Sequence, residues 1–396
     1  MWWVVGFCVL GGWIFGWVWD WVNPKCNGKL PPGNMGFPII GETIQFFSPY
    51  GFYDIPPFIK SRITRFGAIF KTSIVGNKVV VSTDAEVNYK IFQQENKSFL
   101  IWYMESFIEI FGQQSLLAYH GMIHKYLKNL ILHLVGPENL KANVIHEMDH
   151  ATRCHLNLWA SHHTIDVKEA ASDMIFEYFS KKLIGYDEKK TSRKLRQNYI
   201  DFIEGLVSFP LNIPGTAYHS CLQGRKNAIK VIKEMLKERR SSKAVHNDFL
   251  DYLLKEVDKD NTILSEGIAV DLIFALLFAT YETTSASITL LMKFISEKPQ
   301  VLLELKKEHR GIVEKRENEN SQITWEEYKS MTFTHMVINE TVRLANIVPG
   351  VFRKVLEDVE VKGYTIPAGW IVMVVPSVLH LDPDKYENPL TFNPWR

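Results

Sequence analysis

An acid and five hydroxyl side chains follow one another closely in the middle of a long apolar stretch. They are Thr280, Glu282, Thr283, Thr284, Ser285 and Ser287. An unpaired charge buried in such a stretch is costly, so Glu282 needs a polar neighbour. Either another protein group satisfies it, or a ligand with its water does. The second case would make this run a functional site.

A second candidate centre has the spacing of a zinc site. His146, Glu147 and His150 match the pattern HExxH, in which two imidazoles one helical turn apart bind the metal and the glutamate is the base. Glu169 lies where some zinc peptidases take a third ligand. Against this, Asp149 places a carboxylate between the histidines, and a chain with 13 histidines can produce the pattern by chance. A solvated helical face is the simpler interpretation.

The polar run must be positioned by a helix. No Gly or Pro occurs from 268 to 298, Ser265 is a suitable N-cap, and Pro299 ends the pattern. We predict one helix about 46 Å long, enough to cross a domain. Its first half is almost wholly apolar, with Asp271 as the only charge, so it should be buried on most sides.

Composition indicates a folded protein from a reducing compartment. The 396 residues carry 45 basic and 44 acidic side chains, which argues against a nucleic-acid partner, and 46% are hydrophobic. The four cysteines, Cys8, Cys26, Cys154 and Cys221, form no CxxC pair. Neither a disulfide framework nor a zinc ribbon is therefore indicated.

Residues 1–22 are predicted to be a retained membrane anchor. The run is uncharged as far as Trp19 and about as long as a bilayer-spanning helix. It lacks a basic segment before it and a small-residue cleavage site after it. Lys25 and Lys29 follow directly, which by the positive-inside rule places the body in the cytosol. Residues 23–41 are rich in Pro and Gly and indicate a stiff hinge.

The remaining residues, 42–396, are predicted to form a single, mainly α-helical domain with small β-sheets (α+β). The predicted elements are, in order, a hairpin over 67–83, helices over 85–207, an apolar loop over 209–216, helices to about 347, a hairpin over 359–367 and a strand over 370–375.

Three short motifs in the C-terminal third resemble, in order and spacing, signatures of the cytochrome P-450 haem-thiolate monooxygenases. They are Ala279–Thr284, Glu340–Arg343 and Phe392–Arg396. Each is weak alone, since Glu–Arg pairs at i,i+3 are common in helices. Combined with the anchor and the Pro-Pro-Gly hinge, they extend the resemblance over the whole chain. The segment Ile323–Tyr328 and the loop Pro210–Thr216 resemble the plant branch that oxidises sterols and triterpenoids, which includes brassinosteroid oxidases.

The resemblance implies a cytochrome P-450 fold with haem b as cofactor. Electrons would come from NADPH through a flavoprotein, the NADPH–cytochrome P-450 reductase. The protein would cross the endoplasmic reticulum membrane once, and its cytosolic body would insert one oxygen atom of O2 into a sterol or triterpenoid. Thr283 would hold the bound oxygen through its hydroxyl, and Glu282 would relay protons. Thr280 stands in the oxygen groove, where the family often has Gly or Ala. The alternative is that these hydroxyls only bond back to the preceding turn.

The resemblance also assigns groups around the haem. Arg353 matches a position that binds the haem propionates. His124 and Lys128 replace a Trp and an Arg of the family, and Lys offers a point charge rather than a planar fork. The implied structural network behind the haem consists of Glu340, Arg343 and Arg396. The implied substrate walls include Trp102, Phe274, Phe278, Val348 and Val351, any one of which could equally be core.

The family's iron ligand, a cysteine thiolate in a glycine-rich loop, does not occur up to Arg396. None of the four cysteines lies in a suitable element, so no metal ligand is expected in the chain itself. We therefore expect a chain truncated before the haem-ligand loop and the final helix. Two alternatives stay open: a zinc metallopeptidase that uses the HExxH motif, and a non-catalytic, membrane-bound lipid-binding protein.

Overall fold

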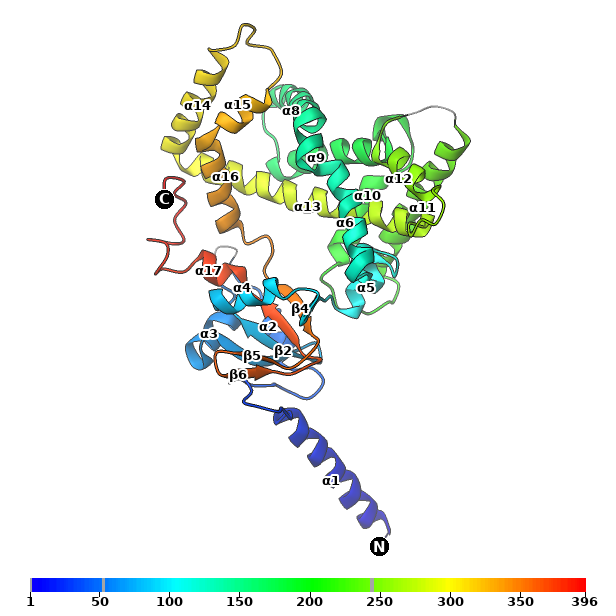
Figure 1. Cartoon of the computed structure of the whole chain (residues 1–396), viewed down its shortest axis with the longest axis vertical. Coiled ribbons are helices and arrows are strands. Elements are labelled where there is room, and N and C mark those ends of the chain that lie inside the picture. Colours follow the sequence, from blue (N-terminus) through cyan, green and yellow to red (C-terminus); the bar gives the residue numbers. More distant parts are fainter. Residues whose placement is uncertain (1, 52–53, 243–245) are drawn as a thin grey trace. The chain divides into compact units, whose positions relative to one another are not determined.

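The structure, a computed structural model, describes the backbone of residues 2–51, 54–242 and 246–396, and the side chains from Leu10 onward within these ranges. Its contacts divide the chain into two compact units (Figure 1). The β-rich unit contains the chain up to Trp102, Val342–Phe392 and Arg396. The helical unit contains Tyr103–Thr341 and Asn393–Trp395.

The β-rich unit is built on one mixed sheet. Its helices are α1 (Trp2–Val22), α2 (Thr43–Phe46), α3 (Pro57–Phe66), α4 (Ala85–Gln93) and α17 (Pro376–His380). Its strands are β1 (Ile69–Ile74), β2 (Asn77–Ser82), β3 (Phe99–Ile101), β4 (Val351–Val355), β5 (Val359–Val361), β6 (Tyr364–Ile366) and β7 (Ile371–Val374). Five strands pair in the order β1-β2-β7-β4-β3, with β2 and β7 parallel, and β5 pairs with β6. Both predicted hairpins and the strand after them are confirmed, whereas β3 was not predicted.

Both faces of this sheet are buried, which explains its nearly continuous apolar strands. Side chains alternate between faces along a strand. Val79 and Val81 pack into one hydrophobic cluster with Met373, whereas Val80 packs into the opposite cluster with Val372. The unbroken valine run of β2 is therefore required by two separate cores.

The Pro/Gly-rich segment after α1 is fixed along β1. The Pro32 carbonyl accepts a hydrogen bond of 2.8 Å from the Lys71 amide. Gly33 has φ of 144°, and a Cβ there would collide with the Lys71 carbonyl oxygen, so only glycine fits. The predicted hinge is thus held against the sheet on its C-terminal side.

The helical unit has these elements: α5 (Glu105–Phe111), η1 (Leu116–Ala118), α6 (Gly121–Val135), α7 (Pro137–Asn139), η2 (Leu140–Val144), α8 (Ile145–Ala160), α9 (Val167–Ile184), η3 (Glu188–Lys190), α10 (Leu195–Gly205), α11 (Ala217–Ser241), α12 (Phe249–Val257), α13 (Glu266–Glu297), α14 (Pro299–Val313), α15 (Trp325–Ser330) and α16 (Thr332–Ala345). The last residues of α16 belong to the β-rich unit. The predicted apolar loop before α11 is confirmed.

The long helix α13 is the element around which the helical unit packs. The Ser265 hydroxyl accepts from the Ile268 amide at 3.2 Å, and the helix ends at Glu297, so both predicted ends are confirmed. α13 packs against α9, α11, α12 and α14 (Figure 1). Among the helices whose side chains are all described, α13 is the one that is long and apolar enough to cross a membrane, and more than half of its apolar window is buried in the protein. We therefore assign α13 to the core.

Candidate active site

Four of the hydroxyls at the middle of α13 belong to exposed or half-buried residues, whereas Ser285 is buried. Thr283 is exposed, as is Ala279 one turn earlier, and Glu282 is half-buried. The expectation of a buried polar midpoint is corrected here, because the packed helices cover the first half of α13 far more completely than its middle. Glu282 therefore does not carry the cost of a fully buried charge.

These hydroxyls bond back to the preceding turn. Thr283 Oγ1 donates to the Ala279 carbonyl at 2.6 Å, and Ser287 Oγ donates to the Thr283 carbonyl at 2.8 Å. Thr280 does the same to Leu276 at 2.8 Å. Each hydroxyl places its proton on the helix and keeps its lone pairs as acceptors. Back-bonding and a functional role are thus compatible for these residues, since an anchored hydroxyl can still accept a hydrogen bond from a group outside the helix.

The first half of α13 is packed by aromatic rings. Phe274 is 0% exposed, and its ring centroid lies 4.9 Å from that of Phe202 and 5.1 Å from that of Tyr199. The Tyr199 hydroxyl also donates to the Phe274 carbonyl at 3.0 Å. Phe278, one turn later, is half-buried and lies 5.1 Å from the Phe111 ring. Of the two α13 residues predicted to form the substrate wall, Phe278 has the more exposed side chain.

A buried ion pair lies beside this aromatic cluster and was not predicted. Arg225 of α11 donates to Asp271 of α13 at 2.7 Å and to the Phe111 carbonyl at 3.2 Å. Burial raises the pKa of Asp271, and Arg225 opposes that shift. Gly112 has φ of 100°, and a Cβ there would collide with both charged groups. Asp271 is the only charged residue from Ile268 to Tyr281, and this was the one signal in the sequence that it needed a partner.

The predicted propionate ligand in the β-rich unit has a carboxylate partner. Arg353 Nε and Nη2 both donate to Glu95, at 3.0 and 2.7 Å, and Nη1 donates to the Phe352 carbonyl. The nearby Trp102 ring lies 6.0 Å from that of Phe352. Val351 begins β4 half-buried, and Val348 is exposed before it. No sequence pattern linked Glu95 to Arg353, because the pair forms only when β3 registers against β4.

In the helical unit, α6 presents the other two predicted cofactor contacts. Lys128 is exposed and His124 is half-buried. The opposite face of α6 packs into the core through Leu127, Leu130 and Leu134. The two polar residues are thus one helical turn apart on the outer side of a firmly packed helix.

The residues of the predicted polar network make contacts within each of the two units. Glu340 is 4% exposed and accepts from the Asn393 amide at 3.0 Å. Arg343 donates to the carbonyls of His380 and Pro389, at 2.6 and 2.8 Å. Arg396 donates to the carbonyls of Glu387 and Thr391.

The ring that joins the two arginines was missed by the sequence analysis. Arg343 and Arg396 both lie over Tyr386, with guanidinium carbons 4.8 and 5.7 Å from its ring centroid. The contact of two guanidiniums with one tyrosine ring is recognisable only once the chain has folded back on itself.

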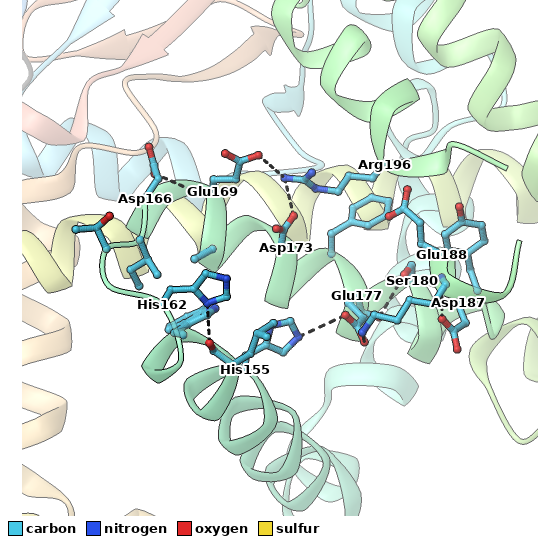
Figure 2. Close-up of a pocket in the computed structure, with 18 residues that line it drawn as sticks. His155, His162, Asp166, Glu169, Asp173, Glu177, Ser180, Asp187, Glu188 and Arg196 are labelled. Carbon is cyan, nitrogen blue, oxygen red and sulfur yellow. Dashed lines mark hydrogen bonds and ion pairs between the residues drawn. The ribbon is translucent and has the colours of Figure 1, made fainter. Parts of the chain in front are cut away.

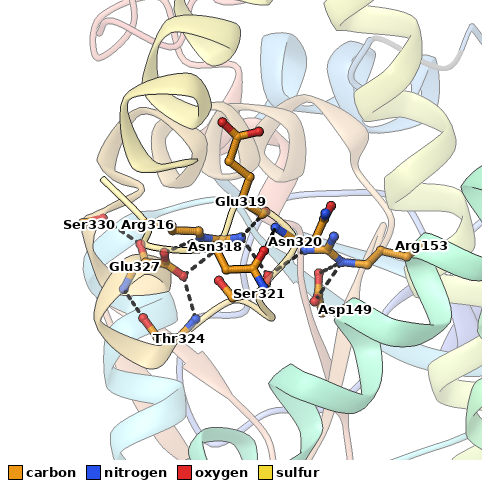
Figure 3. A network of polar contacts seen from close by, with 10 residues as sticks. All are labelled: Asp149, Arg153, Arg316, Asn318, Glu319, Asn320, Ser321, Thr324, Glu327 and Ser330. Carbon is orange, nitrogen blue, oxygen red and sulfur yellow. Dashed lines mark hydrogen bonds and ion pairs between the residues drawn. The ribbon is translucent and has the colours of Figure 1, made fainter. Parts of the chain in front are cut away.

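The HExxH motif lies on α8 and is used for internal contacts. Glu147 is paired with Lys182 at 2.7 Å and accepts from the Tyr178 hydroxyl at 2.9 Å. Asp149 accepts two hydrogen bonds from Arg153, which also reaches the Ser321 carbonyl (Figure 3). In the described part of the chain, no group of three or more His, Cys, Asp or Glu side chains is arranged to hold a metal. The zinc-peptidase alternative is not supported, because Glu147, which would be its base, is already paired with Lys182.

Figure 3 shows how the charges of α8 contact the loop between α14 and α15. Arg316 donates to the same Ser321 carbonyl at 2.8 Å and to Glu327 at 2.6 Å. Glu327 in turn caps α15, accepting from the Thr324 amide at 2.7 Å. The hydrogen bond to Arg316 lowers the pKa of Glu327. The motif therefore helps to fix the loop between α14 and α15.

A pocket of about 660 Å³ lies among α8, α9 and α10 (Figure 2). Its acids are largely paired: Asp173 with Arg196 at 2.7 Å and Glu177 with His155 at 3.5 Å. Burial raises the pKa of Asp173. None of its lining residues belongs to α13, so this pocket has no part in the site on the long helix.

The described cysteines do not fit an iron ligand. Cys221 is buried in the core, where burial raises its pKa to about 12, far from the thiolate that ligation needs. Cys26 Sγ lies 3.9 Å from the Thr365 carbonyl, and Cys154 is exposed on α8. The Cys8 side chain lies outside the described residues. The described cysteine side chains thus offer no thiolate for a haem iron.

Comparison with known proteins agrees with this geometry. The profile of the Cytochrome P-450 family matches residues 31–396. Cytochrome P-450 87A3 of rice, Oryza sativa subsp. japonica, is 54% identical over 94% of this chain and 73% of its own length. The beta-amyrin 16-alpha-hydroxylase of Maesa lanceolata is 41% identical over 94% of this chain and 80% of its own.

A solved structure gives the same result. The retinoic acid-bound cyanobacterial CYP120A1 superposes with a TM-score of 0.82 at 26% identity, covering 93% of this chain and 82% of that one. The family carries haem iron and takes its electrons from a redox partner. The mainly helical fold with small sheets, predicted from the sequence, is therefore confirmed. The chain belongs to the cytochrome P-450 family of haem monooxygenases.

Proposed function

We propose that the protein hydroxylates a sterol or triterpenoid lipid, with Glu282 and Thr283 as its proton-delivering residues. The observation that carries this is the exposed Ala279–Thr283 face of α13, which adjoins the half-buried Phe278 ring. A hydroxyl on an apolar, aromatic-lined helix suits a large lipid whose oxidation needs protons and little water. The likeness to a beta-amyrin hydroxylase supports the same substrate class.

In this proposal the Glu282 carboxylate takes a proton from solvent and releases it to a water held beside Thr283 Oγ1. The Thr283 hydroxyl accepts a hydrogen bond from that water and so positions it, while its own proton stays hydrogen-bonded to the Ala279 carbonyl. The haem, when bound, supplies the oxidising chemistry. Thr280, anchored to Leu276, would border the groove on the same helix.

We further propose that Arg353 holds a haem propionate, with Glu95 as the carboxylate that orients its guanidinium. His124 and Lys128 would serve the propionates from α6. The network of Glu340, Arg343 and Arg396 would keep the segment before the iron ligand in place, and Trp102, Val348 and Val351 would complete the substrate walls.

For location, we propose that α1 is a single membrane-spanning anchor in the endoplasmic reticulum, with residues 23–41 as its hinge and residues 42–396 as one cytosolic monooxygenase domain. The 21 residues of α1 match the length of a bilayer-spanning helix. The electron donor would be the NADPH–cytochrome P-450 reductase, a flavoprotein, and membrane lipid would supply the substrate.

The test compares two chains, because no described cysteine can ligate the iron. One is the 396-residue protein, and the other continues it beyond Arg396 with the residues that follow the matched region in the rice relative. We expect the second to bind haem, to give the reduced, carbon monoxide-bound spectrum of a thiolate ligand, and to hydroxylate beta-amyrin or a sterol with reductase. A haem-loaded extended chain that binds these lipids without oxidising them would instead favour the lipid-binding alternative. An extended chain without haem would refute the proposal.

Replacing Thr283 with Ala in the extended chain is expected to lower the product formed per NADPH on the order of 10²-fold, the lower end of what a positioned proton-transfer group contributes. Haem content and NADPH oxidation should remain, so that reducing power is diverted from product. The matched control is Ser287→Ala, which removes the next back-bonded hydroxyl on the same helix. Thr283→Ser should restore most of the product. Equal yields from Thr283→Ala and Ser287→Ala would remove Thr283 from the reaction.

A further inference from the structure

The buried side of α13 is held by four aromatic rings in contact with one another. Phe274 of α13 stacks on Tyr199 of α10, with ring centroids 5.1 Å apart and planes 26° apart. Phe176 of α9 then meets Tyr199 and Tyr281 edge to face, at 5.6 and 5.4 Å. Because Tyr281 belongs to α13 again, the series of rings leaves the helix and returns to it. We call these four residues the aromatic bracket.

The two ends of the aromatic bracket lie on the side of α13 opposite to Thr283. Phe274 and Tyr281 are seven residues apart, so at 3.6 residues per turn they point within about 20° of each other, roughly 10 Å apart along the axis. Thr283 follows Phe274 by nine residues and points about 180° away from it. The four bracket residues are at most 5% exposed, whereas Thr283 and Ala279 are exposed. Because two fixed points on one face set the rotation of a helix, the bracket determines that Thr283 faces away from the packed helices.

The Tyr199 hydroxyl adds a fixed point along the axis of α13. It donates to the Phe274 carbonyl at 3.0 Å, and neither residue has exposed surface. A carbonyl has two lone pairs, so it can accept this bond beside the one from the amide four residues on in its own helix. Burial raises the pKa of Tyr199 well above its ordinary value, so the hydroxyl remains a donor. The bond lies about one turn before Ala279, whose carbonyl accepts from Thr283 Oγ1 at 2.6 Å.

We propose that Tyr199 is a positioning residue for Thr283, acting through the Phe274 carbonyl and the aromatic bracket. This inference rests on the proposed role of Thr283 and adds the group that keeps its hydroxyl in place. A rotation of α13 by about 15° would move a side-chain atom that lies roughly 4 Å from the helix axis by about 1 Å. A displacement of that size can cost about 10²-fold in the rate of a reaction that depends on position.

The decisive variant is Tyr199→Phe, which keeps the ring in the aromatic bracket and removes only its hydroxyl. The matched control is Tyr186→Phe, because Tyr186 is 2% exposed and its hydroxyl also donates to a carbonyl, that of Arg193, outside the bracket. In the 396-residue protein in detergent, we expect Tyr199→Phe to speed amide hydrogen exchange about fivefold over residues 278–284, the change in local opening that one hydrogen bond is worth. Tyr186→Phe should leave exchange over these residues unchanged.

The second measurement is the product formed per NADPH in the chain extended beyond Arg396. We expect Tyr199→Phe to lower it about fivefold, while haem content and NADPH oxidation remain. The loss is smaller than that expected for Thr283→Ala, because the Thr283 hydroxyl is still present and is held in place for part of the time. Phe176→Leu interrupts the aromatic bracket at its middle and should lower the yield as well. Tyr186→Phe should give the wild-type yield, which separates a positioning role from a loss of stability.

Equal yields from Tyr199→Phe and Tyr186→Phe, or wild-type exchange over residues 278–284 in Tyr199→Phe, would overturn the inference. Exchange that became faster over all the helices of the unit would do so too, since it would show a general loss of stability. If Thr283→Ala lowers the yield and Tyr199→Phe does not, the positioning role fails and the proposed function stands. If Thr283→Ala leaves the yield unchanged, both fail, whatever the exchange rates are.

Discussion

Phe274→Ala is expected to lower the free energy of unfolding by about 3–5 kcal/mol, the range for deleting a buried aromatic ring without refilling its space. The ring has no exposed surface, and it packs between Phe202 and Tyr199. Urea unfolding of the full chain in detergent, followed by circular dichroism, measures the change. The loss should appear without any lipid present.

Phe278→Ala is the matched control, since it removes the same ring from the same helix one turn away. Phe278 is half-buried, so we expect a smaller loss of about 1–2 kcal/mol. In the chain extended beyond Arg396, we expect Phe278→Ala to change which lipid is oxidised. If the two variants lost equal stability, Phe274 would not be the core residue that its burial indicates. If only Phe274→Ala altered substrate preference, the wall would have been assigned to the wrong ring.

Arg225→Met is expected to lower the free energy of unfolding by about 3 kcal/mol near pH 8, because it leaves the carboxylate of Asp271 buried without its cation. The double variant Arg225→Met, Asp271→Asn removes both charges and should regain most of that loss. Urea unfolding of the wild type and both variants measures the difference. A single variant as stable as the double variant would show that Asp271 does not depend on Arg225.

The same variant should depend on pH in a defined direction. Burial already raises the pKa of Asp271, and loss of Arg225 raises it further. A carboxyl whose pKa is raised by folding binds its proton more tightly in the folded state, so its ionisation reduces stability as the pH rises above its ordinary pKa of 3.8. The destabilisation caused by Arg225→Met should therefore become smaller as the pH falls from about 8 towards the ordinary pKa of 3.8, because Asp271 takes up its proton above that pH. A constant penalty would contradict this cause.

Elements with a local pattern were predictable from the sequence. The ends of α13 follow from Ser265 and the proline after it, and the β1–β2 hairpin follows from Gly76, whose φ of 74° permits the turn. The pairing of β2 with β7 was not predictable, because the sequence of a buried strand does not indicate which other strand it pairs with. Short strands are also easily missed, as β3 was, since three residues show too little alternation to stand out.

For the candidate site, only contacts within one helix could be predicted. The back-bonding of Thr283 follows from its place in the polar run, but its exposure depends on which helices cover α13. The contacts of Arg353 with Glu95 and of Arg343 with Tyr386 join segments far apart in the chain. Phe274 and Phe278 look alike in the sequence, and only the rings packed around them distinguish core from open face.

The parallel pairing of β2 with β7 also affects how the chain folds while the ribosome is still making it. β2 is complete at Ser82, yet the strand that must lie beside it begins at Ile371. At roughly 5–20 residues per second, a ribosome needs on the order of 15–60 s to make the intervening chain. During that interval the β1–β2 hairpin offers an unpaired, valine-rich edge, the kind that joins other chains. The protein should therefore depend on chaperones that shield this edge until β7 emerges.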